Sequence, residues 1–326
     1  MLHKPFLLQP AAKDYLWGGT RLNDDFGKKI SLNPLAETWE CSTHENGLSL
    51  IANSHETLRD VLVKHPEYLG THVLKITEGR AELPILIKFI DARLDLSVQV
   101  HPDDDYARLN ENSLGKTEMW YVLSARIGSQ LVYGFNHDMT QERVRTTALN
   151  GTIGKYLNHV KVHKGDVFFI EPGTVHAIGA GCLVAEIQES SNLTYRLYDY
   201  DRVDKHGKKR ELHLDKALKV INLKSSATPK QPLRVIKYQR GCAHELLSRC
   251  RFFQVERILL NSENRHMAEF RTYSNSFHAL LCVDGCGVLY GDDLVLPFFK
   301  GDCIFVPADS MILSMHGKAQ ILDVSC

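Results

Sequence analysis

The chain has 326 residues, of which 44% are hydrophobic and 24% are charged, a composition typical of a globular protein of roughly two domains. Its 39 basic and 39 acidic residues balance, which excludes the strongly basic surface of a nucleic-acid-binding protein. No apolar run reaches the length of about 18 residues that a membrane-spanning helix needs, so we expect neither nucleic acid nor membrane as a partner.

The amino-terminal segment lacks the apolar core and the small-residue cleavage site of a secretory signal, so we expect a cytoplasmic protein. The eight cysteines are predicted to be free thiols, because a chain of this length in a reducing compartment needs no disulfide bonds. The C-x3-C pair of Cys282 and Cys286 has no second pair nearby. We interpret it as core residues that flank a glycine turn, not as a zinc site.

Helical periodicity is confined to a few segments, and the clearest are 54–68, 103–112, 140–150 and 214–223. Ser54 is the predicted N-cap of the first of these helices. Elsewhere, short runs of Val, Ile, Phe, Tyr and Leu are bounded by Gly, Pro, Asp and Asn, which is typical of antiparallel sandwiches and barrels. The predicted fold class is therefore mainly β with a few peripheral helices.

One segment recurs along the chain. The sequence KGDVFFIEPG from Lys164 returns 136 residues later as KGDCIFVPA from Lys300, and each copy predicts a turn, a buried strand and a proline-containing turn. We expect two similar barrels from this repeat. The polar stretch 224–232 is the predicted linker, which divides the chain into a catalytic domain of residues 1–223 and a second, metal-free domain of residues 233–326.

The segment Leu96–His101 alternates between apolar and polar residues, so Ser97, Gln99 and His101 share the polar face of a strand. Glu118 lies near the start of another apolar strand, and His176 follows a tight turn. Two imidazoles and one carboxylate from three strands are the ligand set of a catalytic zinc ion with an open position. Their separations of 17 and 58 residues follow no local pattern, so spacing alone does not distinguish a site from unrelated surface residues.

Longer motifs carry a resemblance to a known family. The chain resembles the short bacterial form of type I mannose-6-phosphate isomerase, a zinc enzyme of the cupin superfamily, along nearly its whole length. The motifs that carry this resemblance are Gln99-Val-His101-Pro, Lys116-Thr-Glu118-Met-Trp, Pro172-Gly-Thr-Val-His176-Ala-Ile, the segment from Ser191 to Arg202, and Arg210-Glu-Leu-His213. Several motifs in this order are far more specific than any single three-residue pattern.

The resemblance implies two tandem cupin barrels of the jelly-roll type, of which only the first binds metal. It implies one zinc ion per chain with His101, Glu118 and His176 as ligands, and catalytic roles for Arg196 and Lys116. The implied reaction is the interconversion of D-mannose 6-phosphate and D-fructose 6-phosphate, so the expected partner is a small sugar phosphate. No oligomeric state follows from the sequence.

Substrate contacts also follow from the resemblance. It implies that Gln99 stands at the fourth ligand position and that Ser97 lies near the phosphate. The chain lacks the large helical insertion of the long form of the family, so any phosphate contacts that the insertion provides have no counterpart. In the repeat, Met311 lies opposite His176, which leaves the second barrel without this ligand.

Several alternatives stay open at this stage. The base that moves the proton is Lys116, if desolvation and the nearby metal lower its pKa, or a hydroxide on the metal. Cobalt, manganese or iron would fit the same ligands. The chain could also isomerise a related sugar, or act as a catalytically silent sugar sensor. We interpret the basic run 205–210 as a solvated hairpin tip with no role, and Trp17, Trp39 and Trp120 as core residues.

Overall fold

The computed structural model describes residues 3–203, 206–227, 229, 231, 233–263 and 266–326. Position 205 of the basic run and positions 228, 230 and 232 of the predicted linker therefore lie outside the described residues. The fold is mainly β, as predicted. In the part of the chain that the structure describes, no helix is long and apolar enough to cross a membrane. The helices are α1 (Arg21–Asp24), α2 (Leu58–Lys64), η1 (Pro66–Leu69), α3 (Thr71–Ile76), α4 (Asp104–Glu111), α5 (Gln141–Leu149), η2 (Ile153–Tyr156) and α6 (Leu214–Val220).

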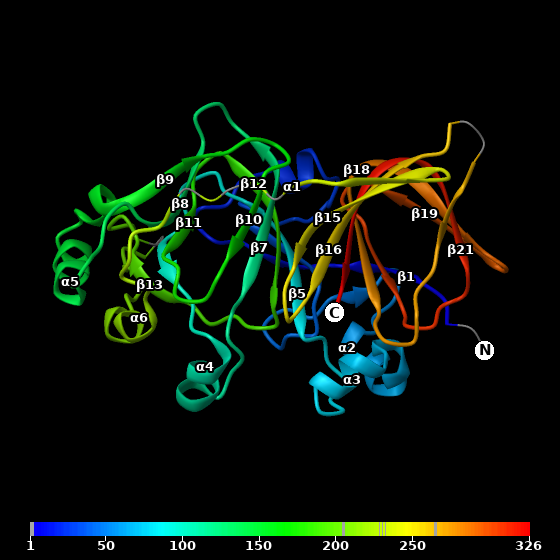
Figure 1. The fold of residues 1–326 in the computed structure, drawn as a ribbon, viewed down its shortest axis with the longest axis horizontal. Helices are drawn as coiled ribbons and strands as arrows, with labels where there is room; N and C mark the ends of the chain where they lie inside the picture. The colour runs from blue at the N-terminus through cyan, green and yellow to red at the C-terminus, as the bar shows by residue number, and fades with distance from the viewer. Residues whose placement is uncertain (1–2, 204–205, 228, 230, 232, 264–265) are drawn as a thin grey trace.

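Two antiparallel sheets form the first β unit, which is drawn mainly in cyan and green in Figure 1, with its amino-terminal strands in blue. The six-stranded sheet has the order β10 (Val167–Ile170), β7 (Glu118–Ala125), β12 (Cys182–Glu189), β5 (Ile85–Asp91), β3 (Glu37–Cys41) and β2 (Ala11–Lys13). The five-stranded sheet has the order β13 (Tyr195–Tyr198), β6 (Val98–Val100), β11 (His176–Ile178), β8 (Gln130–Phe135) and β9 (Leu157–Lys161). Trp120 and Val184 of the first sheet share one buried cluster with Leu131 and Ile178 of the second, so the two sheets enclose a common core.

A ten-stranded sheet forms the second unit, drawn mainly in yellow to red, with its two amino-terminal strands in blue. Its main path is β14 (Ile236–Gln239), β15 (Cys242–Arg249), β16 (Gln254–Asn261), β21 (Leu313–Ser325), β18 (His278–Gly291), β20 (Cys303–Val306), β1 (Phe6–Gln9) and β4 (Leu50–Ile51), while β17 (Ala268–Phe270) pairs with β21 and β19 (Leu294–Phe299) with β18. The amino-terminal strands β1 and β4 thus cross the expected boundary at residue 223. They extend the sheet beyond β20, whose outer edge would otherwise be left unpaired.

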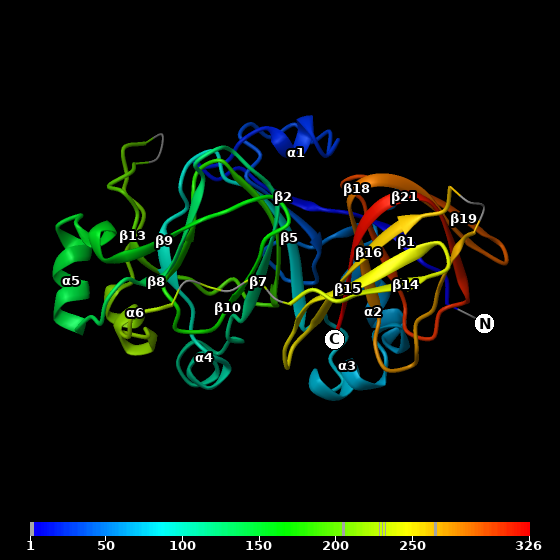
Figure 2. The same cartoon turned by 45° about the horizontal axis from the view of Figure 1, so that its top comes forward.

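The two units lie side by side (Figures 1 and 2). Apolar side chains pack between them. Ile87 and Met119 of the six-stranded sheet belong to the same buried cluster as Leu281, Leu322 and Val324 of the ten-stranded sheet. The helices α2 and α3 contribute Leu62 and Val73 to this cluster. An apolar interface of this kind resists relative motion of the two units and gives the first unit a rigid outer wall.

The sequence repeat is also a structural repeat. Gly165 and Gly301 both adopt left-handed backbone angles, with φ of +90° and +101°, and their N–H groups donate to the neighbouring strand at 2.7 and 2.8 Å. Asp166 and Asp302 each accept a backbone N–H from the residue three positions earlier, at 2.8 and 2.7 Å. The second copy ends in an apolar environment, where Met311 is buried within the core of the ten-stranded unit.

The first predicted helix begins later than expected. Thr57, not Ser54, is the N-cap of α2, because its side chain accepts the Asp60 N–H while the Asp60 carboxylate accepts the Thr57 N–H. The Ser54 hydroxyl instead accepts the N–H of Glu56 in the preceding turn. The other three predicted helices lie where the periodicity places them, although α6 ends at Val220 and not at residue 223.

Candidate functional site

The three predicted metal ligands meet between the two sheets of the first unit. His101 follows β6 and His176 begins β11, so both imidazoles come from the five-stranded sheet. Glu118 begins β7 of the six-stranded sheet and faces them. All three residues are buried, and one donor atom from each lies within 4.8 Å of the others. The structure therefore brings together residues that are up to 75 positions apart in the chain.

The donor atoms have the spacing of a metal site. The two imidazole Nε2 atoms lie 3.1 Å apart, and Glu118 lies 3.7 Å from His101 Nε2 and 3.4 Å from His176 Nε2. Donors at about 2.1 Å from a tetrahedral zinc ion lie about 3.4 Å from one another. The Nδ1 atom of His176 lies 2.8 Å from the carbonyl oxygen of Thr174, which fixes the ring so that Nε2 faces the centre.

The protonation states of these groups also suit a cation. Burial lowers the pKa of His176 to about 4, and burial together with Lys116 lowers the pKa of His101 well below its usual value, so both rings are neutral near pH 7. Burial raises the pKa of Glu118 to about 7. Its Oε1 atom is buried without a hydrogen-bond donor, and its Oε2 atom has the Lys116 ammonium 2.7 Å away. A buried oxygen without a donor is costly, and a bound cation would relieve that cost. The residues present thus fit a divalent metal ion.

Polar side chains continue outward from the candidate metal ligands along the five-stranded sheet. The amide nitrogen of Gln99 lies 3.5 Å from His176 Nε2, and half a turn of the amide group would present its oxygen instead. The Ser97 hydroxyl lies 3.5 Å from the Gln99 oxygen and accepts a hydrogen bond of 3.3 Å from Arg196 Nε. The guanidinium of Arg196 also donates to the carbonyl oxygen of Glu211 at 2.8 Å. These three predicted residues therefore form one row that leads from the metal ligands to the arginine.

Alternating charges line the facing, six-stranded sheet. Lys116 Nζ lies 2.7 Å from Glu118 and 3.8 Å from Glu186, whose carboxylate is 3.3 Å from Lys88 Nζ. Lys88 in turn lies 3.8 Å from Glu37. Burial would raise the pKa of Glu186, but Lys116 and Lys88 outweigh it and lower that pKa to about 2. The facing wall of the site is therefore a row of alternating acidic and basic side chains that hold one another in position.

The site contains three charged residues that were not predicted from the sequence, namely Lys88, Glu186 and Glu37. A signal was present, because Lys88 interrupts the apolar run Ile85–Asp91 and Glu186 interrupts Cys182–Glu189, and charged residues in buried strands need partners. The three tryptophans are buried, as predicted. Two of them also hydrogen-bond to buried carboxylates. The indole N–H of Trp120 donates to Glu186 at 2.9 Å, and that of Trp39 donates to Glu37 at 2.8 Å.

A pocket of about 260 Å³ opens beside this row of charges. Its lining includes Ser97, Gln99, Lys116 and Arg196, and also Arg210 from the basic run. The interpretation of that run as a solvated hairpin tip without a role is therefore wrong for Arg210. Its guanidinium donates to the carboxylate of Asp199 at 2.8 Å, and Asp199 also binds Arg202, so Arg210 is held against the pocket, whereas residues 206–209 of the run are exposed.

Comparison with known proteins identifies the family of this chain. Residues 6–126 match the model of the type I phosphomannose isomerase catalytic domain. Mannose-6-phosphate isomerase ManA of Bacillus subtilis is 36% identical over 329 residues, which cover 99% of each chain. The chain belongs to the type I phosphomannose isomerase family. Another Bacillus subtilis relative, described as the probable mannose-6-phosphate isomerase GmuF, is 43% identical over 67% of this chain and 69% of its own.

Solved structures of this family share the whole fold. The crystal structure of mannose 6-phosphate isomerase from Bacillus subtilis matches with a TM-score of 0.88 and 32% identity, and the match covers 99% of this chain and 100% of that one. A variant of phosphomannose isomerase from Salmonella typhimurium shares the fold at 17% identity, with a TM-score of 0.80. The predicted family and the predicted cupin-type fold class are confirmed.

Proposed function

We propose that this isomerase interconverts D-mannose 6-phosphate and D-fructose 6-phosphate in the pocket beside His101, Glu118 and His176, with one zinc ion held by these three residues. The observation that supports this most directly is the convergence of three buried donors, spaced 3.1 to 3.7 Å apart, next to a pocket lined by arginine and lysine. Two imidazoles and a carboxylate favour zinc, and cobalt, manganese or iron would accept the same donors.

The reaction moves one proton between neighbouring carbons. Mannose 6-phosphate loses the proton on C2 and gains one on C1, while the hydrogen on the C2 hydroxyl is given up and the C1 oxygen is protonated. A bound zinc ion supplies a Lewis acid that polarises the two sugar oxygens. We assign to Arg196 the stabilisation of the enediolate, because its planar guanidinium remains charged and lies in the pocket with two N–H groups already oriented by Ser97 and Glu211.

Lys116 is our candidate for the group that moves the proton. It lies 3.2 Å from His101 and 2.7 Å from Glu118, so its ammonium reaches the space where C1 and C2 must lie if their oxygens approach the metal ligands. Burial alone would lower the pKa of Lys116, but Glu118 and Glu186 outweigh burial and raise it. The expected lowering of this pKa is therefore not seen. A divalent cation at the same ligands would repel the ammonium and shift the pKa downward.

Arg210 suits the phosphate group, because Arg196 is assigned to the enediolate at the other end of the sugar. Arg210 lines the pocket, as does the hydroxyl-bearing Ser97. Phosphate oxygens accept bidentate hydrogen bonds from guanidinium groups. We therefore place the phosphate at this end of the pocket, with Ser97 as a further donor. The expected cytoplasmic location remains a prediction.

Turnover of mannose 6-phosphate in heavy water tests the function and the proton route together. We expect deuterium on C1 of the fructose 6-phosphate formed, because a proton held by a lysine exchanges with solvent before it is returned. Lys116→Met should slow isomerisation and deuterium incorporation together, and Lys164→Met, at an exposed lysine, should change neither.

Two other results would overturn parts of this assignment. Absence of any fructose 6-phosphate from the wild-type protein would contradict the function and favour a sugar-binding sensor. Undiminished isomerisation and exchange in Lys116→Met would assign the proton transfer to another base in the pocket.

A further inference from the structure

The segment that carries Lys116 into the site is an irregular loop, residues 113–117, between α4 and β7. It makes a close turn, because a Cβ atom on Gly115 would lie 2.5 Å from the backbone of Asp103 and Asp104. The N–H of Lys116 donates to the carbonyl oxygen of Pro102 at 3.1 Å. The position of the Lys116 side chain therefore depends on how this short loop is held.

Two buried carboxyl groups hold the loop from its outer side. Glu189, at the end of β12, accepts the N–H of Thr117 at 2.7 Å, and Asp104, at the start of α4, accepts the N–H of Gly115 at 2.9 Å. These two N–H groups flank Lys116 in the sequence. Glu189 is 2% exposed, so its hydrogen bond is shielded from competing water.

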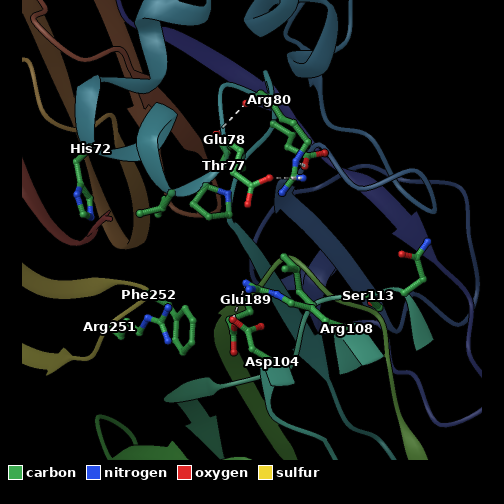
Figure 3. A pocket seen from close by; sticks show the side chains of 16 residues that line it. His72, Thr77, Glu78, Arg80, Asp104, Arg108, Ser113, Glu189, Arg251 and Phe252 are labelled. Carbon is green, nitrogen blue, oxygen red and sulfur yellow. Dashed lines mark hydrogen bonds and ion pairs between the residues drawn. The ribbon is translucent and has the colours of Figure 1, made fainter. Parts of the chain in front are cut away.

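The two carboxyl groups face a cavity of about 600 Å³ at the junction of the two β units. Figure 3 shows Glu189 and Asp104 side by side on one wall, with Arg108 beside Asp104 and with Arg251 and Phe252 contributed by the second unit. Arg108 donates to the second oxygen of Asp104 at 3.0 Å. Neither carboxyl group lines the active-site pocket, so neither can contact substrate there.

We propose that Glu189 and Asp104 are positioning residues that hold loop 113–117 so that Lys116 Nζ stays within reach of Glu118 and of the substrate carbons. The proposal rests on the proposed function of Lys116. It predicts that what matters at position 189 is a hydrogen-bond acceptor for Thr117. The negative charge at that position is not required.

The test compares Glu189→Leu with Glu189→Gln. Leucine removes the acceptor and has room in the adjoining cavity, whereas glutamine keeps an acceptor oxygen and can donate its amide to Asp104. We expect kcat for mannose 6-phosphate to fall about ten-fold or more in Glu189→Leu, with KM and metal content unchanged, and to stay within about two-fold of wild type in Glu189→Gln. Asp302→Leu, which removes a similar turn acceptor in the second unit, should leave kcat unchanged.

A crystal structure of each variant gives a readout that does not depend on activity. In Glu189→Leu we expect loop 113–117 to shift and the 2.7 Å contact between Lys116 and Glu118 to lengthen, and in Glu189→Gln we expect both to be preserved. An unmoved loop in Glu189→Leu, or equal loss of kcat in the two variants, would overturn the proposal. An inactive wild type would count against the proposed function alone, because the loop position can still be compared. If Glu189→Leu does not fold, Asp104→Leu and Asp104→Asn make the same comparison on Gly115.

Discussion

His176→Ala should abolish isomerisation, leaving less than about 1% of wild-type activity, and should lower the metal content of the purified protein. The reason is that His176 Nε2 is one of three buried donors, 3.1 Å from His101 and 3.4 Å from Glu118, so its removal would leave only two of the three proposed ligands. Activity is measured by coupling fructose 6-phosphate formation to a dehydrogenase, and metal by elemental analysis of the same sample.

Two controls separate loss of metal from loss of fold. His163→Ala removes a histidine whose side chain is 81% exposed, and it should retain full activity and metal. The second β unit has its own apolar core around Met311 and should remain folded in His176→Ala, as judged by thermal unfolding. Wild-type activity in His176→Ala would exclude this residue from the metal site.

Arg196→Lys should lower kcat roughly 100-fold or more while the side-chain charge is retained. The guanidinium donates through Nε to Ser97 and through a terminal nitrogen to the Glu211 carbonyl, and this leaves its remaining N–H groups aimed in one plane. An ammonium group has no such plane. Steady-state kinetics with mannose 6-phosphate measures the effect.

The matched control for this substitution is Arg145→Lys. Arg145 forms an ion pair with Asp215 on the surface, where 44% of its side chain is exposed, so its replacement should leave kcat unchanged. Near-normal turnover in Arg196→Lys would show that Arg196 supports the loop at Glu211 and takes no part in the reaction.

The candidate metal ligands His101, Glu118 and His176 could be named from the sequence because each lies in a motif that resembles the family, whereas residue types and spacing alone did not distinguish them from unrelated surface residues. His101 lies on the polar face of an alternating strand, and His176 follows a proline-glycine turn. What the sequence did not provide was their convergence, which depends on β11 pairing with β6 and on the six-stranded sheet lying opposite. Those contacts join residues 75 positions apart, and no local pattern encodes them.

Lys88, Glu186 and Arg210 were missed for different physical reasons. Lys88 and Glu186 lie on adjacent strands, with Glu186 directly opposite Lys88, but the order of strands in a sheet is a property of the whole fold. Arg210 lies in a run of basic residues that is typical of a solvated turn. Its hydrogen bond to the buried Asp199, which holds it against the pocket, depends on the tertiary fold. The first helix started late because the capping box of Thr57 and Asp60 competes better than the single hydroxyl of Ser54.

Titration of metal-free protein with zinc, followed by the mannose 6-phosphate assay at each step, tests the central claim most directly. The claim is that one ion, held by His101, Glu118 and His176, is required for isomerisation. We predict that metal-free protein is inactive and that activity rises linearly and reaches its plateau at one ion per chain. Full activity before any zinc is added, or a plateau only at two ions per chain, would contradict this account.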